Sequence, residues 1–314
     1  MTAQDRGGMT RRRALKCMAW AGTGLVWTVS GGVPKAAGLL GSPETAALPA
    51  GDFHFVQISD SHIGFAKEAN PDVVGTLRQA IAKVDALPAR PRFVVHTGDV
   101  SHLSKAEEYD LAQQVLGEMK TGPIHFIPGE HDMLDEQPGT HFRERFAKGT
   151  QGTGWYSFDD GGVHFVALVN VANLKAGGMG SLGDEQLAWL TNDLQPLSAS
   201  TPVVVLAHIP LWTIAKDWGW GTEDSAAALD QLRRFGSVTV LNGHIHQVMQ
   251  KVEGNITFHT AMSTAYPQPQ PGTAPGPGPM KVPAGQLGHV LGIRSMDIVP
   301  GRAQQALADM TLSS

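Results

Sequence analysis

The chain has 314 residues, of which 42% are hydrophobic and 17% are charged, and its formal net charge is −5. This length and apolar fraction suffice for one large α/β domain with a well-buried core. The mildly acidic balance offers no basic patch, so the backbone of a nucleic acid is excluded as an expected partner.

The N-terminal segment is expected to be an export signal and not part of the fold. Three arginines at 11–13 precede an apolar run at 17–29, which is too short and too rich in glycine for a membrane span. This order resembles a twin-arginine signal. We therefore expect a signal peptide at 1–37, read by the twin-arginine export machinery, and a linker at 38–51. The mature protein would be periplasmic or secreted without a stable membrane span, whereas an uncleaved signal would anchor it.

The only cysteine, Cys17, lies inside this expected signal. The mature chain would then hold no thiol, which excludes disulfides and cysteine-ligated metals. Its thirteen histidines leave imidazole as the abundant metal-binding group.

After the linker, strand-like and helix-like patterns alternate. Strands are expected at 53–60, 92–99 and 124–130, with helices at 70–87 and 104–119 between them. Asn70 is expected to cap the first helix, followed by Pro71 at its first position. Ser104 and Glu107 are expected to form a capping box on the second helix.

The second half of the chain contains more hairpins. The first expected elements are a hairpin at 155–169 turning at Asp160-Gly161 and a helix at 184–194. Strands at 202–210 and 237–246 around a helix near 223–235 follow, and then hairpin strands to about 299 with a turn near Glu253-Gly254-Asn255. Such a pattern indicates mixed β-sheets layered with helices, in a domain over 52–300 followed by a C-terminal tail at 301–314. The Pro/Gly-rich segment at 266–285 is either disordered, the reading that we favour, or a functional rim loop.

Five short blocks share one feature, because each lies where an apolar strand ends. They are SDSHIG (Asp60, His62), TGDVSH (Asp99), PGEHD (Glu130, His131), LAHIP (His208) and NGHIH (His244, His246). Strand ends of an α/β sheet meet at one rim, where ligands bind. Alternate residues of an extended strand point the same way, so Asp60 and His62 should share one ion, and His244 and His246 one face. Imidazoles and carboxylates without sulfur suit Zn, Fe or Mn.

The order of these blocks resembles the calcineurin-like metallophosphoesterase superfamily over about residues 53–250. The stretch GSLGDEQLAWLTNDL at 180–194 resembles the branch that holds purple acid phosphatases and cyclic-nucleotide phosphodiesterase-like enzymes. The resemblance implies an α/β (α+β) fold of two packed mixed β-sheets flanked by helices, a four-layer sandwich.

The resemblance also implies a cofactor of two divalent or mixed-valence metal ions. The first ion would be held by Asp60, His62 and His246, the second by Glu130, His208 and His244, and both would be bridged by Asp99. The expected function is hydrolysis of small phosphate mono- or diesters by a hydroxide bound to both ions. His131 would face the leaving oxygen as general acid or charge stabiliser. Asp132 would orient it, or cap the next helix.

Glu130 stands where the family has Asn. A carboxylate also coordinates, but it lowers the charge of the cluster with two divalent ions from about +2 to about +1. This change favours either a trivalent ion such as Fe(III) or a monoanionic diester substrate. The alternative is that Glu130 turns to a lysine or arginine, leaving a catalytically weak or inactive metallophosphoesterase-like binding module.

A second departure lies at His102, three residues after Asp99. The serine/threonine phosphatase branch has an aspartate there, so its absence argues against a phosphoprotein phosphatase. We expect the side chain of His102 to be exposed. The tryptophans at 212, 218 and 220 follow His208 and either overhang the metals or pack in the interior.

Overall fold

The computed structural model describes residues 25–30, 33–38, 53–298 and 306–313. The chain divides into two compact units, residues 1–48 and 49–314. In the first unit, strands β1 (Leu25–Ser30) and β2 (Val33–Gly38) form an antiparallel hairpin. The arginine motif and the start of the apolar run lie outside the described residues. Among the described residues, no helix combines the length and the apolar character that crossing a membrane requires.

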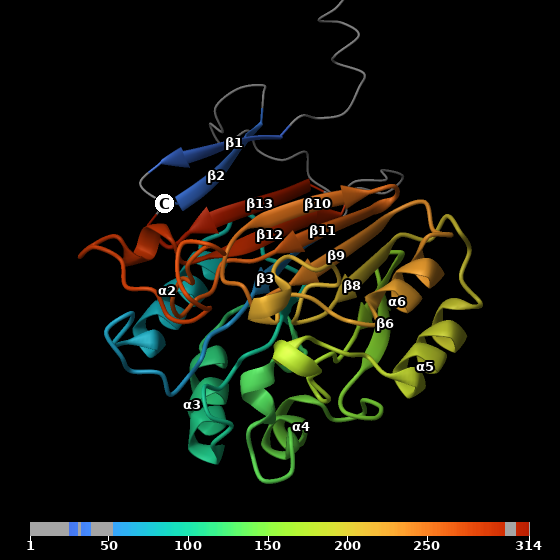
Figure 1. Cartoon of the computed structure of the whole chain (residues 1–314), viewed down its shortest axis with the longest axis horizontal. Coiled ribbons are helices and arrows are strands. Elements are labelled where there is room, and N and C mark those ends of the chain that lie inside the picture. Colours follow the sequence, from blue (N-terminus) through green and yellow to red (C-terminus); the bar gives the residue numbers. More distant parts are fainter. Residues whose placement is uncertain (1–24, 31–32, 39–52, 299–305, 314) are drawn as a thin grey trace, which may run out of the picture. The chain divides into compact units, whose positions relative to one another are not determined.

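The second unit contains a six-stranded mixed sheet (Figure 1). Its strands, in spatial order, are β10 (Met249–Glu253), β11 (Ile256–Thr260), β9 (Val238–Asn242), β8 (Val203–Leu206), β7 (Val163–Ala167) and β6 (Tyr156–Asp160). The four central strands are parallel, and the two edge strands are antiparallel to their neighbours. Both predicted hairpin turns are confirmed, since Asp160 pairs with Val163 and Glu253 pairs with Ile256.

A five-stranded mixed sheet packs against the first. Its strands, in spatial order, are β13 (Ala306–Thr311), β12 (Gly292–Ile298), β3 (Phe53–Ile58), β4 (Val94–His96) and β5 (Ile124–Phe126). Strands β3, β4 and β5 are parallel, while β12 and β13 are antiparallel to their neighbours. The prediction of a tail at 301–314 is therefore wrong for 306–311, which form an edge strand of this sheet.

Helices cover the outer faces of the two sheets. They are α2 (Val73–Asp85), α3 (Ala106–Leu116), α4 (Thr140–Phe146), α5 (Asp184–Leu194) and α6 (Ser225–Leu232), with short 3₁₀ turns η1 (Glu130–Met133), η2 (Ala176–Gly178), η3 (Lys216–Trp218) and η4 (Leu287–His289). Figure 1 shows α2 and α3 on one side of the strands and α5 and α6 on the other. The predicted four-layer sandwich is confirmed.

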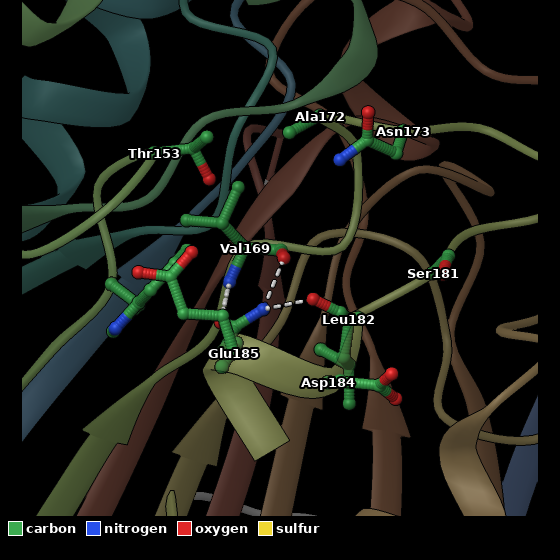
Figure 2. Close-up of a pocket in the computed structure, with 11 residues that line it drawn as sticks. Thr153, Val169, Ala172, Asn173, Ser181, Leu182, Asp184 and Glu185 are labelled. Carbon is green, nitrogen blue, oxygen red and sulfur yellow. Dashed lines mark hydrogen bonds between the residues drawn. The ribbon is translucent and has the colours of Figure 1, made fainter. Parts of the chain in front are cut away.

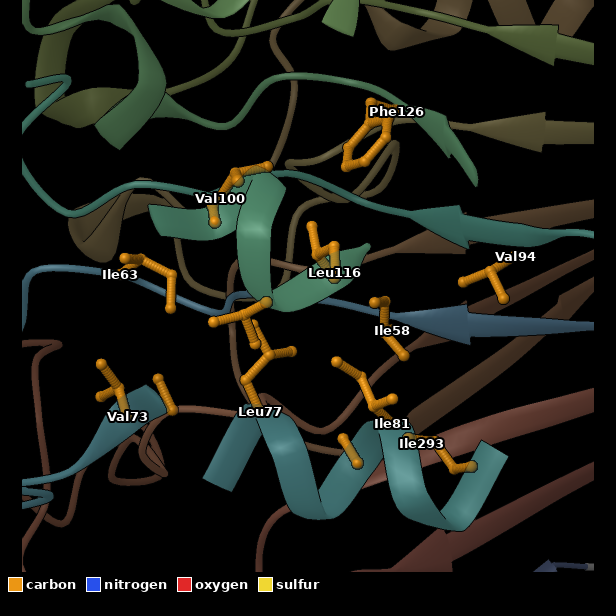
Figure 3. Close-up of a cluster of buried hydrophobic side chains, with 14 of the residues drawn as sticks. Ile58, Ile63, Val73, Leu77, Ile81, Val94, Val100, Leu116, Phe126 and Ile293 are labelled. Atoms are coloured by element: carbon orange, nitrogen blue, oxygen red, sulfur yellow. The ribbon is translucent and has the colours of Figure 1, made fainter. Parts of the chain in front are cut away.

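The side chains of β3 point alternately to the two faces of its sheet, and this explains how the layers pack together. Phe55 points between the sheets, where its ring stacks on Phe93 at 5.0 Å and meets Phe165 edge-on at 5.4 Å. Ile58, three residues later on the same strand, points to the opposite face, and Figure 3 shows Leu77 and other side chains of α2 directed toward it. Each face of the strand therefore buries its own apolar layer.

Both predicted helix caps differ from the structure. Asp72, not Asn70, caps α2, and its carboxylate accepts the N–H of Gly75 at 2.8 Å. Asn70 instead donates to the carbonyl of Ala265, 195 residues away. The N-cap of α3 is Lys105, without a side-chain bond. In both cases the side chain expected to cap the helix, that of Asn70 or Ser104, has a hydrogen-bond partner elsewhere in the fold. These partners override the local capping pattern.

The Pro/Gly-rich segment at 266–285 contains no helix or strand, but hydrogen bonds tie it down. The N–H of Met280 donates to the carbonyl of Pro267 at 2.8 Å, and the N–H of Gly278 donates to the side chain of Gln268 at 3.0 Å. Disorder, the reading we favoured, is therefore wrong for this segment, and it occupies a defined place in the fold.

Candidate metal centre

The ligand candidates lie in tight turns directly after the parallel strands. Asp60 and His62 follow β3, Asp99 follows β4, and His244 and His246 follow β9. All five have left-handed backbones, with φ of 55°, 42°, 53°, 69° and 55° respectively. Among the described residues the only other non-glycine with positive φ is Ser104. Such conformations are costly and persist where the surrounding structure enforces them, as at functional sites.

These turns correct one step of the sequence argument. Asp60 and His62 were expected to share an ion because alternate residues of a strand point the same way. The strand β3 ends at Ile58, so both residues lie beyond it, and the turn brings their side chains together. Hydrogen bonds fix that turn, since the N–H of Asp60 donates to Gly98 at 3.0 Å and that of His62 to Asp99 at 2.9 Å.

Glycine is required at position 98 for two reasons. Its backbone φ of 98° is an angle that residues other than glycine rarely adopt. A Cβ atom there would also overlap the imidazole of His208 and come within 2.8 Å of the main-chain nitrogen of Gly129. The glycine before Asp99 thus lets two other strand-end turns approach it.

Asp60, His62 and His246 form a first group of side chains, all buried. Nε2 of His246 lies 3.2 Å from Oδ1 of Asp60 and 3.3 Å from Nε2 of His62. Ligands bound at roughly 2.0–2.2 Å to one ion lie at about this separation from one another. The group can therefore hold one metal ion.

Glu130, His208 and His244 form a second group. Oε2 of Glu130 lies 2.9 Å from Nε2 of His208, and Oε1 lies 2.9 Å from Nδ1 of His244. The expected alternative, in which Glu130 turns away to a lysine or arginine, is wrong. Its carboxylate faces both imidazoles, as a ligand would.

Asp99 lies between the two groups. Its Oδ2 is 3.5 Å from Nε2 of His62 in the first group and 3.4 Å from Nε2 of His208 in the second. The other oxygen, Oδ1, accepts the main-chain N–H of His131 at 2.9 Å. One carboxylate oxygen thus has the position that a ligand shared by two ions requires.

Several of these ligand atoms are buried without a hydrogen bond. They are Oδ2 of Asp60, Oε2 of Glu130, Nε2 of His208 and both ring nitrogens of His244. Glu130 faces His208 and His244 in ion pairs, whereas Oδ2 of Asp60 and Nε2 of His244 have neither kind of partner among the contacts described above. Buried polar atoms normally have partners, and leaving them without one is costly. Metal ions between the two groups would supply the missing partners, so the residues present fit a two-metal centre.

Main-chain carbonyls orient two of the imidazoles. Nδ1 of His208 donates to the carbonyl of Thr97 at 2.6 Å, and Nδ1 of His246 donates to that of Tyr266 at 2.6 Å. In a neutral ring, each bond keeps the proton on Nδ1 and leaves Nε2 facing the centre as the atom that can bind a metal ion. This is the usual outer support of a metal-binding histidine.

The charges within the second group are complementary. Burial alone would raise the pKa of Glu130, but His244 and His208 outweigh it and hold that pKa well below its ordinary value. Burial lowers the pKa of His208, while Asp99 and Glu130 outweigh it and raise that pKa well above its ordinary value. The carboxylate of Glu130 is therefore ionised at this site.

His131 lies beside this centre, and His102 lies beside His131. Nδ1 of His131 donates to the main-chain carbonyl of His102 at 2.7 Å, and the two rings stack at 4.9 Å. Nδ1 of His102 is also 3.4 Å from Nδ1 of His62. The expectation that His102 is exposed is therefore wrong, since its half-buried ring contacts two site histidines and its carbonyl occupies the role expected of a carboxylate.

Asp132 does not orient His131 through its side chain. Its carboxylate accepts hydrogen bonds from the main-chain N–H groups of Val100, Ser101 and Gly129 and from the hydroxyl of Tyr109. Burial, and then the charge of Asp99, raise the pKa of Asp132 to about 7. Asp132 thus joins the turn after β4 to the turn that holds Glu130, which is a structural role that sequence reasoning missed.

The tryptophans after His208 pack against other rings, with Trp220 buried and Trp212 and Trp218 half-buried. Trp212 lies 5.1 Å from the ring of Phe258, and Trp218 meets the fully buried Trp220 edge-on at 5.0 Å. Of the two interpretations of these residues, packing is the one that the contacts support.

A pocket of about 150 Å³ opens at the start of α5, apart from the candidate ligands. Figure 2 shows the hydrogen bonds there: the side chain of Gln186 donates to the carbonyls of Val169 and Leu182, and the N–H of Val169 donates back to it. This explains the glutamine of the sequence motif at 180–194, which fastens α5 to the segment after β7. None of the seven candidate ligands lines the pocket.

Comparison with known proteins adds independent information. The model of the family described as calcineurin-like phosphoesterase matches residues 53–248. The serine/threonine-protein phosphatase CPPED1 of Danio rerio is 27% identical over 227 residues, covering 63% of this chain and 71% of that protein. The probable glycerophosphodiester phosphodiesterase GpdQ of Arcobacter nitrofigilis is 24% identical over 228 residues, covering 67% and 78%. The crystal structure of a dimetal phosphatase from Danio rerio has the same fold, with a TM-score of 0.65, 16% identity and coverage of 83% and 97%.

Proposed function

The chain belongs to the calcineurin-like phosphoesterase family, and we propose that it hydrolyses phosphate esters at a centre of two metal ions held by the seven converging side chains. The observation that carries this proposal is the geometry of Asp99, whose Oδ2 lies within 3.5 Å of an imidazole nitrogen of each group. A shared carboxylate between two ligand sets is what a dinuclear hydrolase needs. The two relatives named above are a phosphatase and a phosphodiesterase, both acting on phosphate esters.

Each residue has a definite task in this proposal. Asp60, His62 and His246 would hold the first ion, while Glu130, His208 and His244 would hold the second. Such a pair of ions, when bound, would supply polarisation of the phosphoryl oxygens and an activated water at neutral pH. Because Oδ1 of Asp99 accepts the N–H of His131, the bridging carboxylate is held at a fixed angle to the strand end.

His131 is assigned to the leaving oxygen. Its Nδ1 is committed to the carbonyl of His102, so Nε2 is the nitrogen that faces reacting groups. One of its ring nitrogens lies within 4.8 Å of the carboxylate oxygens of Asp99 and Glu130, which places it at the rim of both ion sites. From there Nε2 donates a proton to the oxygen that leaves phosphorus.

Phosphodiesters are the proposed substrate class. Asp60, Asp99 and Glu130 place three carboxylates in the centre, so two divalent ions leave a charge of about +1. Among the described residues, the salt bridges of the seven ligands join imidazoles to carboxylates, without a lysine or arginine. A monoanionic diester therefore suits the site better than a dianionic monoester.

The negative charge of Glu130 also affects which metal ions suit the centre. The donors are imidazoles and carboxylates without sulfur, which suits Fe, Zn or Mn. The extra negative charge of Glu130 favours a trivalent ion at the second site. We therefore propose Fe(III) paired with a divalent ion when iron is available, which restores a charge of about +2 and removes the preference for diesters. The proposed preference for diesters applies to the centre with two divalent ions.

The test compares diester and monoester hydrolysis by the purified protein after reconstitution with Mn, Zn or Fe. We expect faster turnover of bis(4-nitrophenyl) phosphate than of 4-nitrophenyl phosphate, and loss of both activities in Asp99→Ala. Asp184→Asn is the matched control, because Asp184 is exposed and lies outside the centre. Comparable hydrolysis by Asp99→Ala would contradict the proposal.

A binding module without turnover is the second candidate. One observation favours it: Glu130 reaches both imidazoles of the second group at 2.9 Å, so an ion pair could replace the second ion. In that case the protein would bind one ion and a phosphate ester but would not hydrolyse it. Metal content together with turnover separates the two candidates.

We further propose that the twin-arginine machinery exports the protein to the periplasm or beyond, with an uncleaved anchor as the alternative. The support is the order of the arginines at 11–13 and the apolar run at 17–29. Replacing Arg11 and Arg12 by lysine should retain the protein in the cytoplasm. Export of that variant at the original level would contradict the proposal.

A further inference from the structure

The Pro/Gly-rich segment begins directly against the metal centre. Its first residue, Tyr266, is 3% exposed, and its main-chain carbonyl accepts Nδ1 of His246 at 2.6 Å. Two residues later, Gln268 contacts the turn that carries His244. The segment therefore reaches a residue of each ligand group, whereas the sequence favoured disorder over a functional rim loop.

The ring of Tyr266 covers the imidazoles of the first group. It stacks on His62 with the ring centres 4.8 Å apart and an angle of 25°, and it lies 4.8 Å from His246 at 45°. The ring of Phe65 lies 4.4 Å from the ring of Tyr266, at an angle of 40°. Two imidazoles of one ion site thus rest on a single aromatic surface, which restricts the rotation of both rings.

The main chain around Tyr266 is fixed by the same turn that carries Asp60. The hydroxyl of Ser263 donates to the carbonyl of Asp60 at 2.7 Å and accepts the N–H of Tyr266 at 3.2 Å. Asn70 donates to the carbonyl of Ala265 at 2.7 Å. Tyr266 is therefore held in register with the first group and cannot move independently of it.

Gln268 supports the second group through the main chain. Its Nε2 donates to the carbonyl of His244 at 2.7 Å, and its Oε1 accepts the N–H of Gly278 at 3.0 Å. Gln247, next to His246, donates back to the carbonyls of Gln268 and Pro269 at 3.0 and 2.8 Å. This matters because His244 has a left-handed backbone, with φ of 69°, that needs outside support.

We propose that Tyr266 and Gln268 are positioning residues of the metal centre. Tyr266 holds His62 and His246 for the first ion through its ring and carbonyl, and Gln268 holds the backbone of His244 for the second ion. The inference rests on the proposed two-metal centre and assigns it an outer support that lies beyond the family's matched region, which ends at residue 248.

The expected size of the effect follows from comparable supports. Losing a partner that orients a metal-binding histidine weakens metal binding by roughly 10–100-fold. Tyr266→Leu removes the ring but keeps an apolar side chain and the main-chain carbonyl. We therefore expect the affinity for one ion to fall by about tenfold, the low end of that range. Tyr266→Phe keeps the ring and should bind both ions as the original protein does.

The experiment measures both metal affinities by titrating the metal-stripped full chain with Mn or Zn, after circular dichroism has shown that each variant is folded. Tyr266→Leu should lower the affinity for one ion and leave the affinity for the other unchanged. In His62→Ala the first site is already impaired, so adding Tyr266→Leu should not lower the affinity for the remaining ion further. Gln268→Ala should lower the affinity for the other ion. This variant also provides an independent test if Tyr266→Leu does not fold.

Two controls separate positioning from general destabilisation. Tyr156→Leu removes an aromatic ring from the layer between the sheets, and Thr273→Ala removes a hydrogen bond within the same segment. Both should bind two ions with unchanged affinity. The inference is wrong if Tyr266→Leu and Gln268→Ala also bind two ions with unchanged affinity. It is equally wrong if Tyr266→Phe binds metal as weakly as Tyr266→Leu. If the unaltered protein binds no ions, the proposed function itself fails.

Discussion

Replacing Glu130 by glutamine tests the electrostatic argument about substrate charge. Glutamine has the same length and keeps an oxygen that can face His208 and His244, which lie 2.9 Å from the present carboxylate oxygens. The substitution removes one negative charge, so the cluster with two divalent ions would rise from about +1 to about +2. A dianionic monoester should gain more from this change than a monoanionic diester.

The size of the gain follows from Coulomb's law. A phosphoryl group at the centre lies on the order of 5 Å from Glu130, and at an effective dielectric constant of about 20 one unit of charge is worth roughly 3 kcal/mol. The side chain of Glu130 is 24% exposed, so water screens part of this interaction. We expect about 1.5 kcal/mol, which changes the ratio of monoester to diester kcat/KM by roughly tenfold in favour of the monoester.

The assay measures kcat/KM for 4-nitrophenyl phosphate and bis(4-nitrophenyl) phosphate in the original protein and in Glu130→Gln, at saturating metal. Glu136→Gln removes the same charge from an exposed position outside the centre and serves as control. An unchanged ratio, or a shift toward the diester, would refute the charge argument, even if the overall rate fell.

Other substitutions address the remaining assignments. His131→Gln should lower kcat by roughly 10²–10⁴-fold while the metal content stays the same, as elemental analysis can show. Burial lowers the pKa of His164, but the hydrogen bonds that its ring donates to the carboxylates of Asp193 and Asp159 outweigh burial and raise that pKa. The stabilisation is therefore complete below about pH 6.5 and disappears as the pH rises through the raised pKa. The difference in unfolding free energy between the original protein and His164→Gln should therefore be larger at about pH 5.5 than at about pH 9. Leu77→Ala, at a fully buried position of α2, should lower the free energy of unfolding by about 2–5 kcal/mol in a denaturant titration.

The sequence predicts the fold well where the signal is periodic. The helix at 184–194 has the predicted bounds, and both hairpins turn where Asp160 and Gly254 stand. Long apolar periodicity reports burial directly, so these elements are visible without tertiary information. The helix at 140–146 and the strand at 306–311 were not predicted, because both are short and depend on neighbours distant in sequence.

The sequence predicted that the seven candidate ligands converge, but not the way in which the turns hold them. The expected alternation along extended strands is replaced by left-handed turns at Asp60, His62 and His244. The glycine at 98 was the available signal, since a glycine before an aspartate at a strand end indicates close approach of another chain segment. Single-sequence patterns do not report which backbone strain the rest of the fold enforces.

Contacts between distant segments were missed for the same reason. We expected the side chain of His102 to be exposed, yet its carbonyl fixes His131 and its ring contacts His62. Tyr266 lies 204 residues after His62, and only the folded chain brings the two rings together. Residues of this kind support the site without providing its chemistry, so no spacing rule reveals them.

The central claim is that seven side chains hold two metal ions on either side of Asp99. The most direct test is elemental analysis of the folded protein, purified from a natural host without added metal, together with the Asp99→Ala variant. The account predicts about two ions per chain, with iron prominent among them, and a clear loss of metal in the variant. One ion or none in the unaltered protein, with no rise in thermal stability on adding Mn or Zn, would contradict it.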